Sequence, residues 1–340
     1  MKIKILVLNI SDLGGIERAA MNLYNTFKTS PVTSDVQIIS INGKSDKPYA
    51  ITLKGNSENS KLLYFSKNID KNTIVLSMYD RFSIKLSIIR KLFHLNFQLY
   101  ACQHADFFAH KPHTRLLRSI FYRWVDKIIA LTEEDSKLYK LKFKHTYVVP
   151  NVLSFYPQNI QLLKDRKIDC AAAGRLVPIK QFDHFIYFLQ KIYKRCGNYK
   201  IYGNGIEFNT MHKLLQDSKI NSEDILVGSV NDIEKEFCNV KFFFVTSERE
   251  SFSMVILEAM ACGCVVISYD CPTGPRELIK NNINGILVPL NDKNALVEKY
   301  NELINTPELC QTISNNARAY SKNFLSGEIL KKWIFIFNEQ

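Results

Sequence analysis

Short apolar runs alternate with segments of helical periodicity along almost the whole chain. In the first half the β-rich runs are Lys4–Asn9, Val36–Ser40, Thr73–Ser77, Gln98–His104, Lys127–Leu131 and Tyr147–Pro150. In the second half they are Ala171–Gly174, Tyr199–Gly203, Ile225–Gly228, Val240–Thr246, Val265–Tyr269 and Gly285–Pro289. Near-continuous apolar strands separated by helical stretches of roughly 10–15 residues are typical of parallel sheets covered on both faces. The pattern predicts an α/β protein with two such sheets.

A proline- and asparagine-containing segment, Pro150–Pro157, separates the two sets of strands and is predicted to be a linker. We therefore expect Rossmann-like domains over residues 1–153 and 154–322, and a C-terminal helix over 323–340 that packs back on the first domain. Ligands of open α/β sheets bind beyond the carboxyl ends of the strands. We expect the site in a cleft between the domains. The polar stretch Ser45–Asn68 is predicted to be loop.

Composition excludes several other classes. No uncharged apolar stretch reaches the 18 or so residues of a membrane span. The start, MKIKILVLNI, has an apolar core shorter than the roughly 7–15 residues of a signal peptide, so we expect a buried first strand and a cytoplasmic protein. The eight cysteines form no CxxC pair and no zinc-like spacing with histidine, which argues against a disulfide or zinc framework.

Charge is unevenly distributed. The first 150 residues hold 23 Lys+Arg and 12 Asp+Glu, a net charge of +11, whereas the rest of the chain carries a net charge of +1. Such asymmetry suggests that the first half faces an anionic partner, either nucleic acid or acidic lipid.

Two segments of this half, Arg81–Lys91 and Lys111–Arg123, interleave cations with Ile, Leu, Phe and Tyr. As amphipathic helices they would suit the anionic, cytoplasmic face of an inner membrane. Alternatively, their apolar sides pack on the sheet and the cations are merely solvated. The charge excess favours the membrane, and nucleic acid is disfavoured because no recognised motif or aromatic platform is present.

The stretch Glu248–Gly263 (ERESFSMVILEAMACG) places carboxylates in an otherwise apolar run. The pattern predicts a turn and then a helix over Met254–Cys262, ended by Gly263. Glu250 would precede the helix and Glu258 would lie about two turns along it.

The start of a helix leaves its first N–H groups without intrahelical partners, here predicted around Phe252, Ser253, Met254 and Val255, and adds the positive end of the helix dipole. A phosphate-sized anion would bind there. Flanking carboxylates suit a nucleotide-sugar, in which hydroxyl-bearing rings flank a diphosphate. The alternative is that the three glutamates of the stretch are ordinary solvated charges.

Other strand ends carry weaker signals. Gly174 and Arg175 end one strand, and Lys180 precedes the next helix, so the two cations could neutralise a diphosphate; they could equally be surface charges. Gly203 in YGNG would let backbone approach a ligand, although many loops look similar. The Thr273-Gly274 N–H groups could form a second phosphate nest, or simply a turn.

In the first half, Gly14-Gly15 allows a close backbone approach but lacks the GxGxxG dinucleotide fingerprint. His104 and Asp106 end a strand. His104 is a candidate for contact with a transferred sugar and Asp106 a weaker one, although a lone histidine is more often structural.

The ordered motifs GG…E, GRLVPIK, YGNG, E-x7-E with AMACG, DCPTGPREL and NGILVP resemble the retaining glycosyltransferases of family 4. The resemblance covers nearly the whole chain and is densest from Ala171 to Pro289. It implies the GT-B fold, in which two Rossmann-like domains with parallel sheets face a central cleft. It also implies transfer of a hexose or N-acetylhexosamine from a nucleotide-diphosphate sugar, preferably a UDP-sugar. The implied acceptor is a lipid-linked saccharide in capsule, O-antigen or lipopolysaccharide synthesis.

The resemblance also implies residue roles. Glu258 would hold the ribose hydroxyls and Glu250 the donor sugar, while Arg175 and Lys180 would grip the diphosphate. From the other domain, Gly15 and His104 would lie near the phosphate and sugar. The implied catalytic set is Glu250, His104, Arg175 and Lys180; donor contacts would add Gly15, Gly174, Gly203, Phe252, Ser253, Met254, Val255 and Glu258.

One position departs from the family pattern, since Ser251 stands where glycine usually follows the first glutamate. This makes donor identity less secure, and no nucleophile is assigned. No DxD motif is present, so we expect neither a metal ion nor another cofactor. Two rival hypotheses are a nucleotide-sugar epimerase of similar build and a non-catalytic membrane-surface module.

Overall fold

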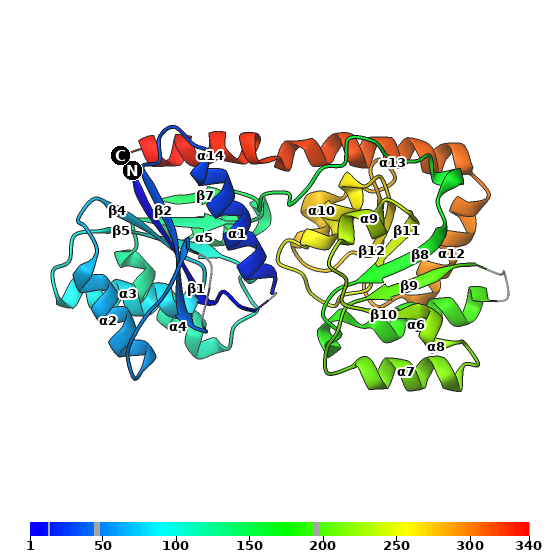
Figure 1. The fold of residues 1–340 in the computed structure, drawn as a ribbon, viewed down its shortest axis with the longest axis horizontal. Helices are drawn as coiled ribbons and strands as arrows, with labels where there is room; N and C mark the ends of the chain where they lie inside the picture. The colour runs from blue at the N-terminus through cyan, green and yellow to red at the C-terminus, as the bar shows by residue number, and fades with distance from the viewer. Residues whose placement is uncertain (13, 44–47, 194–196, 340) are drawn as a thin grey trace. The chain divides into compact units, whose positions relative to one another are not determined.

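The computed structural model describes residues 1–12, 14–43, 48–193 and 197–339. The chain divides into two compact units, one made of Met1–Val152 with Phe324–Gln340 and the other of Leu153–Asn323. Each unit is built around its own parallel sheet with helices on the faces (Figure 1). The predicted α/β class with two parallel sheets is therefore confirmed.

Within the described residues, the sheet of the first unit has seven parallel strands in the order β3-β2-β1-β4-β5-β6-β7. The strands are β1 (Lys2–Asn9), β2 (Asp35–Asn42), β3 (Ala50–Thr52), β4 (Thr73–Ser77), β5 (Gln98–Gln103), β6 (Lys127–Ala130) and β7 (Thr146–Val148). The helices are α1 (Gly15–Lys28), α2 (Glu58–Asn68), α3 (Asp80–Leu92), α4 (Pro112–Phe121), η1 (Tyr122–Trp124), α5 (Glu133–Lys140) and α14 (Ser326–Asn338).

Helices cover both faces of this sheet, as the unbroken apolar strands require. On one face, α1 and α14 pack together over β1, and the rings of Phe27 and Trp333 meet edge to face with centroids 5.5 Å apart. On the other face, α2 and α3 bury Phe65 and Phe82 against the same strands. The C-terminal helix α14 thus contributes to the core of the first unit (Figure 1).

The prediction of loop over Ser45–Asn68 is wrong where the structure can test it. Residues 45–47 lie outside the described residues, but β3 and α2 occupy much of the remainder. Helix α2 begins with a reciprocal cap, in which the Ser57 side chain accepts from the Ser60 N–H and the Ser60 side chain accepts from the Ser57 N–H. A serine at the third helical position replaces the usual glutamate of this motif, so the signal is weak in the sequence.

The described residues of the second unit form a six-stranded parallel sheet in the order β10-β9-β8-β11-β12-β13. The strands are β8 (Ile168–Ala173), β9 (Tyr199–Tyr202), β10 (Leu226–Gly228), β11 (Val240–Val245), β12 (Val265–Tyr269) and β13 (Ile286–Val288). The α-helices are α6 (Phe182–Ile192), α7 (Phe208–Asp217), α8 (Ser222–Ile225), α9 (Ile233–Phe237), α10 (Met254–Ala261), α11 (Gly274–Leu278), α12 (Lys293–Ile304) and α13 (Pro307–Ser321). Short 3-10 turns are η2 (Leu163–Asp165), η3 (Pro178–Lys180) and η5 (Lys322–Phe324).

Each sheet has one place where the chain order reverses, between β1 and β4 in the first unit and between β8 and β11 in the second. The connections that leave the two strands at such a point diverge to opposite faces, which opens a crevice at their carboxyl ends. These are the positions at which each unit can best bind a ligand. Among the helices that the structure describes, none is both long and apolar enough to cross a membrane.

Candidate active site

The candidate site of the second unit lies at the carboxyl ends of β8 and β11. These strands are hydrogen-bonded neighbours, with Phe244 opposite Ala172. The segment after β8 ends in η3, and the segment after β11 leads into α10. Adjacent parallel strands therefore deliver Lys180 and Glu250 to the same edge of the sheet.

Glu250 and Lys180 form an ion pair there. Lys180 Nζ donates to Glu250 Oε1 over 2.6 Å, and Ser247 Oγ donates to the same oxygen over 2.7 Å. Only 9% of Glu250 is exposed, so its carboxylate needs such donors to offset the loss of water. Two of the residues predicted to share a site are thus brought into direct contact.

Backbone contacts fix the two segments to each other around this pair. The Glu248 N–H donates to Ile179 O over 2.9 Å, and Thr246 Oγ1 donates to Lys180 O over 3.0 Å. The ion pair is therefore supported by a paired backbone and does not depend on two freely moving side chains.

A third segment, which follows β12, reaches the same residue. Gly274 N–H and Thr273 Oγ1 both donate to the Glu250 carbonyl oxygen, over 3.1 Å and 2.5 Å. A Cβ on Gly274 would lie 2.8 Å from the Phe252 backbone, so glycine is required by packing. The expectation of a second phosphate nest at Thr273-Gly274 is wrong for Gly274, because its N–H is already bonded within the protein.

The start of α10 has unsatisfied polar groups. Ser253 adopts a left-handed conformation, with φ 69° and ψ 77°, that is costly for any residue except glycine. Its buried hydroxyl has no hydrogen-bond partner among the described residues. The Met254 and Val255 amides, in the first helical turn, also donate to no described residue. These groups are donors that an anion can use.

The other end of α10 is held by two buried or half-buried arginines. Arg166 Nη2 donates to Cys262 O over 2.8 Å, and Arg318 Nη1 donates to Ala261 O over 3.0 Å. Cations stabilise the negative end of a helix dipole. Gly263 follows with φ +70°, which ends the helix where the sequence predicted.

Glu258 lies within α10 and is 1% exposed. Its Oε1 accepts a hydrogen bond of 2.9 Å from Ser154 Oγ, which comes from the segment between the two sets of strands. Neither Ser154 nor Ser247 was identified from the sequence, because serine is common in loops and its partners depend on the fold. The spacing of Ser247, three residues before Glu250, is the one local signal that was available.

Gly203 is required by its close approach to the Gly174 backbone, and Gly174 by its own positive φ. A Cβ on Gly203 would lie 1.9 Å from Gly174 O, and the two glycines have φ of +131° and +151°. The segments after β8 and β9 can therefore run side by side. Arg175, next to Gly174, is exposed and forms no ion pair with any described residue. Its guanidinium is available for an anion at the same sheet edge.

In the first unit, Gly14 and Gly15 lie at the start of α1 and differ in their surroundings. A Cβ on Gly14 would come 2.5 Å from Glu17 Oε2, whereas one on Gly15 would meet no atom within 4 Å. Glu17 is buried and accepts a hydrogen bond of 2.6 Å from Tyr79, which follows β4. Packing against Glu17 explains the glycine at position 14, whereas Gly15 leaves the backbone open to approach by a ligand.

His104 directly follows β5. Burial lowers its pKa from 6.5 to about 4, although the nearby Asp80 carboxylate opposes the shift, so the imidazole is neutral at pH 7. Asp106, the weaker candidate, is buried and accepts from the Phe108 N–H over 3.0 Å, which closes a local turn.

A buried polar network, missed from the sequence, secures the segment that carries His104. Asp80 accepts from Arg118, His110 and Tyr122 over 3.1, 3.0 and 2.6 Å. Burial would raise the pKa of Asp80, but these donors bring it below its usual value. Arg118 also donates to Phe107 O over 2.7 Å and is itself buried. Helix α4 thus anchors this segment from inside.

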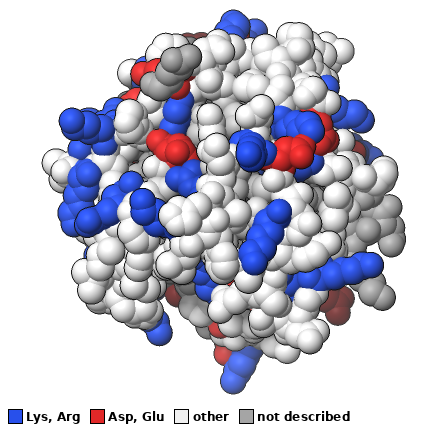
Figure 2. All heavy atoms as spheres, turned by 90° about the vertical axis from the view of Figure 1, so that its left-hand side faces the viewer, with Lys and Arg blue, Asp and Glu red and all other residues white. Residues whose placement is uncertain are grey.

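The two basic segments, now helices α3 and α4, differ in how much of their apolar surface is exposed. Helix α3 buries Phe82 and Leu86 completely against its own sheet, as the alternative interpretation required. Helix α4 instead exposes 62% of Leu116 and 40% of Leu117, with Ile120 also exposed. On the face of the first unit seen in Figure 2, Lys and Arg outnumber Asp and Glu.

Comparison with known proteins gives consistent matches. Residues 158–320 match the family model for glycosyl transferases group 1. An uncharacterized glycosyltransferase of Haemophilus influenzae is 27% identical over 357 residues, covering 98% of each chain. The amylovoran biosynthesis glycosyltransferase AmsD of Erwinia amylovora is 24% identical over 355 residues, covering 99% of each. Anabaena Alr3699/HepE, solved in complex with UDP-glucose, superimposes with a TM-score of 0.82 at 17% identity over the full length of both chains. This likeness shows the GT-B fold that the motif series implied.

The low pKa of His104 predicts a pH-dependent stability. Between about pH 6.5 and 4 the unfolded chain protonates this histidine and the folded chain does not, so stability falls as pH falls. In urea unfolding, we expect the free-energy difference between wild type and His104→Gln to shift by about 2 kcal/mol across this window, after a discount for partial exposure. Burial raises the pKa of Asp135 to about 6, which has the opposite effect on the pH dependence of stability. This contribution is present in both wild type and His104→Gln, so it cancels in the difference between them. The control is His113→Gln, which alters an exposed histidine of the same unit; equal pH dependence of stability in the two variants would contradict the assignment.

Proposed function

We propose that this chain, a glycosyltransferase that carries a group 1 domain in residues 158–320, moves a hexose or N-acetylhexosamine from a nucleotide-diphosphate sugar to a hydroxyl of a lipid-linked saccharide. The reaction would retain the anomeric configuration, as in family 4, and serve bacterial surface-polysaccharide synthesis. The observation that carries the proposal is the ion pair between half-buried Lys180 and buried Glu250, which lies beside the unsatisfied start of α10. The matches support a transferase rather than an epimerase or a binding module.

The donor diphosphate fits the cationic part of this site. When the sugar–phosphate bond breaks, negative charge develops on the departing diphosphate, and stabilising it is the main electrostatic task. The exposed Arg175 fork, the Lys180 ammonium and the amides of Met254 and Val255 are donors for that charge. None of these groups needs a metal ion to act.

The carboxylates suit the two hydroxyl-bearing rings. Lys180 and Ser247 both donate to Oε1 of Glu250, and Oε2 has no hydrogen-bond partner among the described residues. Oε2 is then the acceptor for a hydroxyl of the donor sugar. Glu258, with Ser154 beside it, is proposed to accept from the ribose. A UDP-sugar is the preferred donor, since the similar Anabaena protein was solved with UDP-glucose.

In the first unit, Gly15 and His104 are the residues proposed to contact the donor phosphate and sugar. A neutral imidazole carries one N–H and one acceptor nitrogen, so His104 can donate to a sugar oxygen without adding charge. The open space around Gly15 admits a phosphate to the backbone.

The lipid-linked acceptor is proposed to meet the protein at the membrane surface, with α4 as the contact. Its exposed Leu116, Leu117 and Ile120 would enter the interface, while Lys111 and Arg115 would face anionic headgroups. The similar glycosyltransferase AmsD is named for amylovoran biosynthesis, which supports a role in polysaccharide synthesis. The protein would act peripherally on the cytoplasmic face of the inner membrane.

Glu250→Ala is expected to lower donor turnover at least 100-fold, because it removes the sugar-facing carboxylate and frees Lys180. Release of nucleoside diphosphate from UDP-, GDP- and ADP-sugars measures the rate. The donor that raises the melting temperature most identifies the substrate. Glu248→Gln, two residues away and exposed, should keep the rate within about twofold. A Glu250→Ala variant with a near-normal rate would refute the site.

Activity is expected to survive EDTA, because Arg175, Lys180 and the start of α10 carry the charge compensation. The same nucleoside diphosphate assay, run after dialysis against chelator, measures it. An absolute requirement for Mn²⁺ or Mg²⁺ would contradict the mechanism.

Membrane binding is tested by liposome sedimentation. The chain is expected to pellet with anionic but not neutral vesicles, and the double variant Leu116→Ser/Leu117→Ser should lower its partition at least tenfold, since each buried leucine contributes about 1.5–3 kcal/mol. Leu309→Ser, which alters an exposed leucine of α13, is the matched control. Equal recovery of wild type in the supernatant with both vesicle types would remove the membrane proposal.

A further inference from the structure

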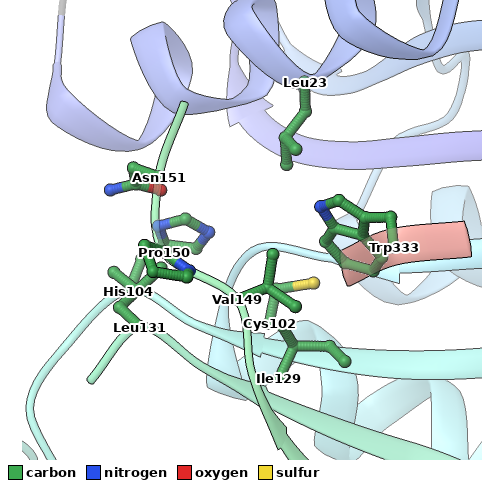
Figure 3. A pocket seen from close by; sticks show the side chains of 9 residues that line it. All are labelled: Leu23, Cys102, His104, Ile129, Leu131, Val149, Pro150, Asn151 and Trp333. Atoms are coloured by element: carbon green, nitrogen blue, oxygen red, sulfur yellow. The ribbon is translucent and has the colours of Figure 1, made fainter. Parts of the chain in front are cut away.

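A small cavity lies inside the first unit, behind the proposed substrate contact His104. Its volume is about 10 Å³. Its walls come from β5, β6, α1, the segment after β7, and α14. Its lining includes Leu23, His104, Val149, Asn151 and Trp333 (Figure 3).

The indole of Trp333 has an unsatisfied donor at this cavity. Trp333 is 1% exposed, and its Nε1–H has no hydrogen-bond partner among the described residues. The indole nitrogen lies on the side of the ring that faces the pocket, with the His104 imidazole across from it (Figure 3). A buried indole N–H usually finds a partner, because leaving it unpaired costs the full penalty of desolvation.

The cavity has the size and polarity of a site for one water molecule. A volume near 10 Å³ is about the minimum that admits a single water, which must also find two to four polar partners. Trp333 supplies a donor, and His104 and Asn151 supply acceptors. The remaining walls are mostly aliphatic and would not hold a larger polar ligand.

We propose that one buried water accepts the Trp333 Nε1–H bond and donates to the ring nitrogen of His104 that faces the pocket, and that Trp333 thereby fixes the His104 tautomer. The ring nitrogen that accepts from the water is unprotonated, so the proton resides on the other nitrogen. The second hydrogen of the water is available to the Asn151 side-chain oxygen.

Trp333 is then a positioning residue, located more than 200 positions along the chain from the histidine it orients. The low pKa of His104 agrees with this arrangement, since only a neutral ring has a tautomer to select. The consequence for catalysis rests on the proposed function: the N–H on the far side of the ring would be presented to the donor sugar.

The test compares wild type with Trp333→Phe, which keeps an aromatic ring but removes the donor. Long-range ¹H–¹⁵N NMR of the His104 ring at pH 7 is expected to show one dominant tautomer in wild type and a redistribution of about fivefold in the variant, roughly the effect of one lost hydrogen bond. A crystal structure of the full chain is expected to show a water within hydrogen-bond distance of Trp333 Nε1. Phe337→Leu, one turn further along α14, is the control that alters packing without removing a donor.

An empty cavity in that crystal structure, or an unchanged tautomer ratio in Trp333→Phe, would overturn the proposal. If Trp333→Phe does not fold, Val149→Ile tests the same water by adding a methyl group to another wall of the cavity, and it should shift the tautomer likewise. Measurements of transfer activity distinguish a failure of the water bridge from a failure of the proposed catalytic contact of His104. A shifted tautomer in Trp333→Phe combined with normal turnover in His104→Gln would support the water bridge and refute only the catalytic contact of His104.

Discussion

The candidate site of the second unit depends on the donors that surround one nearly buried carboxylate, that of Glu250. Removing a carboxylate from water costs several kcal/mol unless donors replace the lost solvent. Here Lys180 and Ser247 supply side-chain donors, and Thr273 and Gly274 bond the carbonyl of the same residue. The segments that follow β8, β11 and β12 are therefore fixed around a single position. This explains why an otherwise apolar stretch tolerates an acidic residue.

The two ends of helix α10 differ in whether their free backbone groups have hydrogen-bond partners. Its C-terminus is satisfied by the guanidinium groups of Arg166 and Arg318, which also oppose the helix dipole. Its N-terminus begins with the strained, left-handed Ser253 and leaves donors unpaired. Strain and unsatisfied groups persist only where the surrounding structure determines them, and they concentrate at ligand sites. Helix α10 is thus held at its C-terminus, while the unpaired donors of its N-terminus lie at the candidate site.

The basic half of the chain shows that charge alone does not identify a surface. Helices α3 and α4 have similar mixtures of cations and apolar residues, yet α3 buries its apolar side and α4 exposes part of its own. Arg118, which the sequence placed among the outward cations, is buried against Asp80 and holds the segment that follows His104. A single helix therefore presents leucines outward while it anchors a candidate site residue inward.

The sequence by itself determined the strands, the two parallel sheets, the end of α10 at Gly263 and the ordered motifs, because these follow from apolar runs, glycine and spacing along one segment. The resemblance of its motifs also implied that Lys180 and Glu250 share one donor site. Sequence analysis missed the short strand β3, whose three residues give too little pattern. Only the tertiary structure decided which serines bond the glutamates, that the Gly274 N–H is already used, that Arg118 is buried, and that Trp333 faces His104. Burial and hydrogen-bond partners depend on neighbours contributed by distant segments, so the local sequence pattern does not predict them.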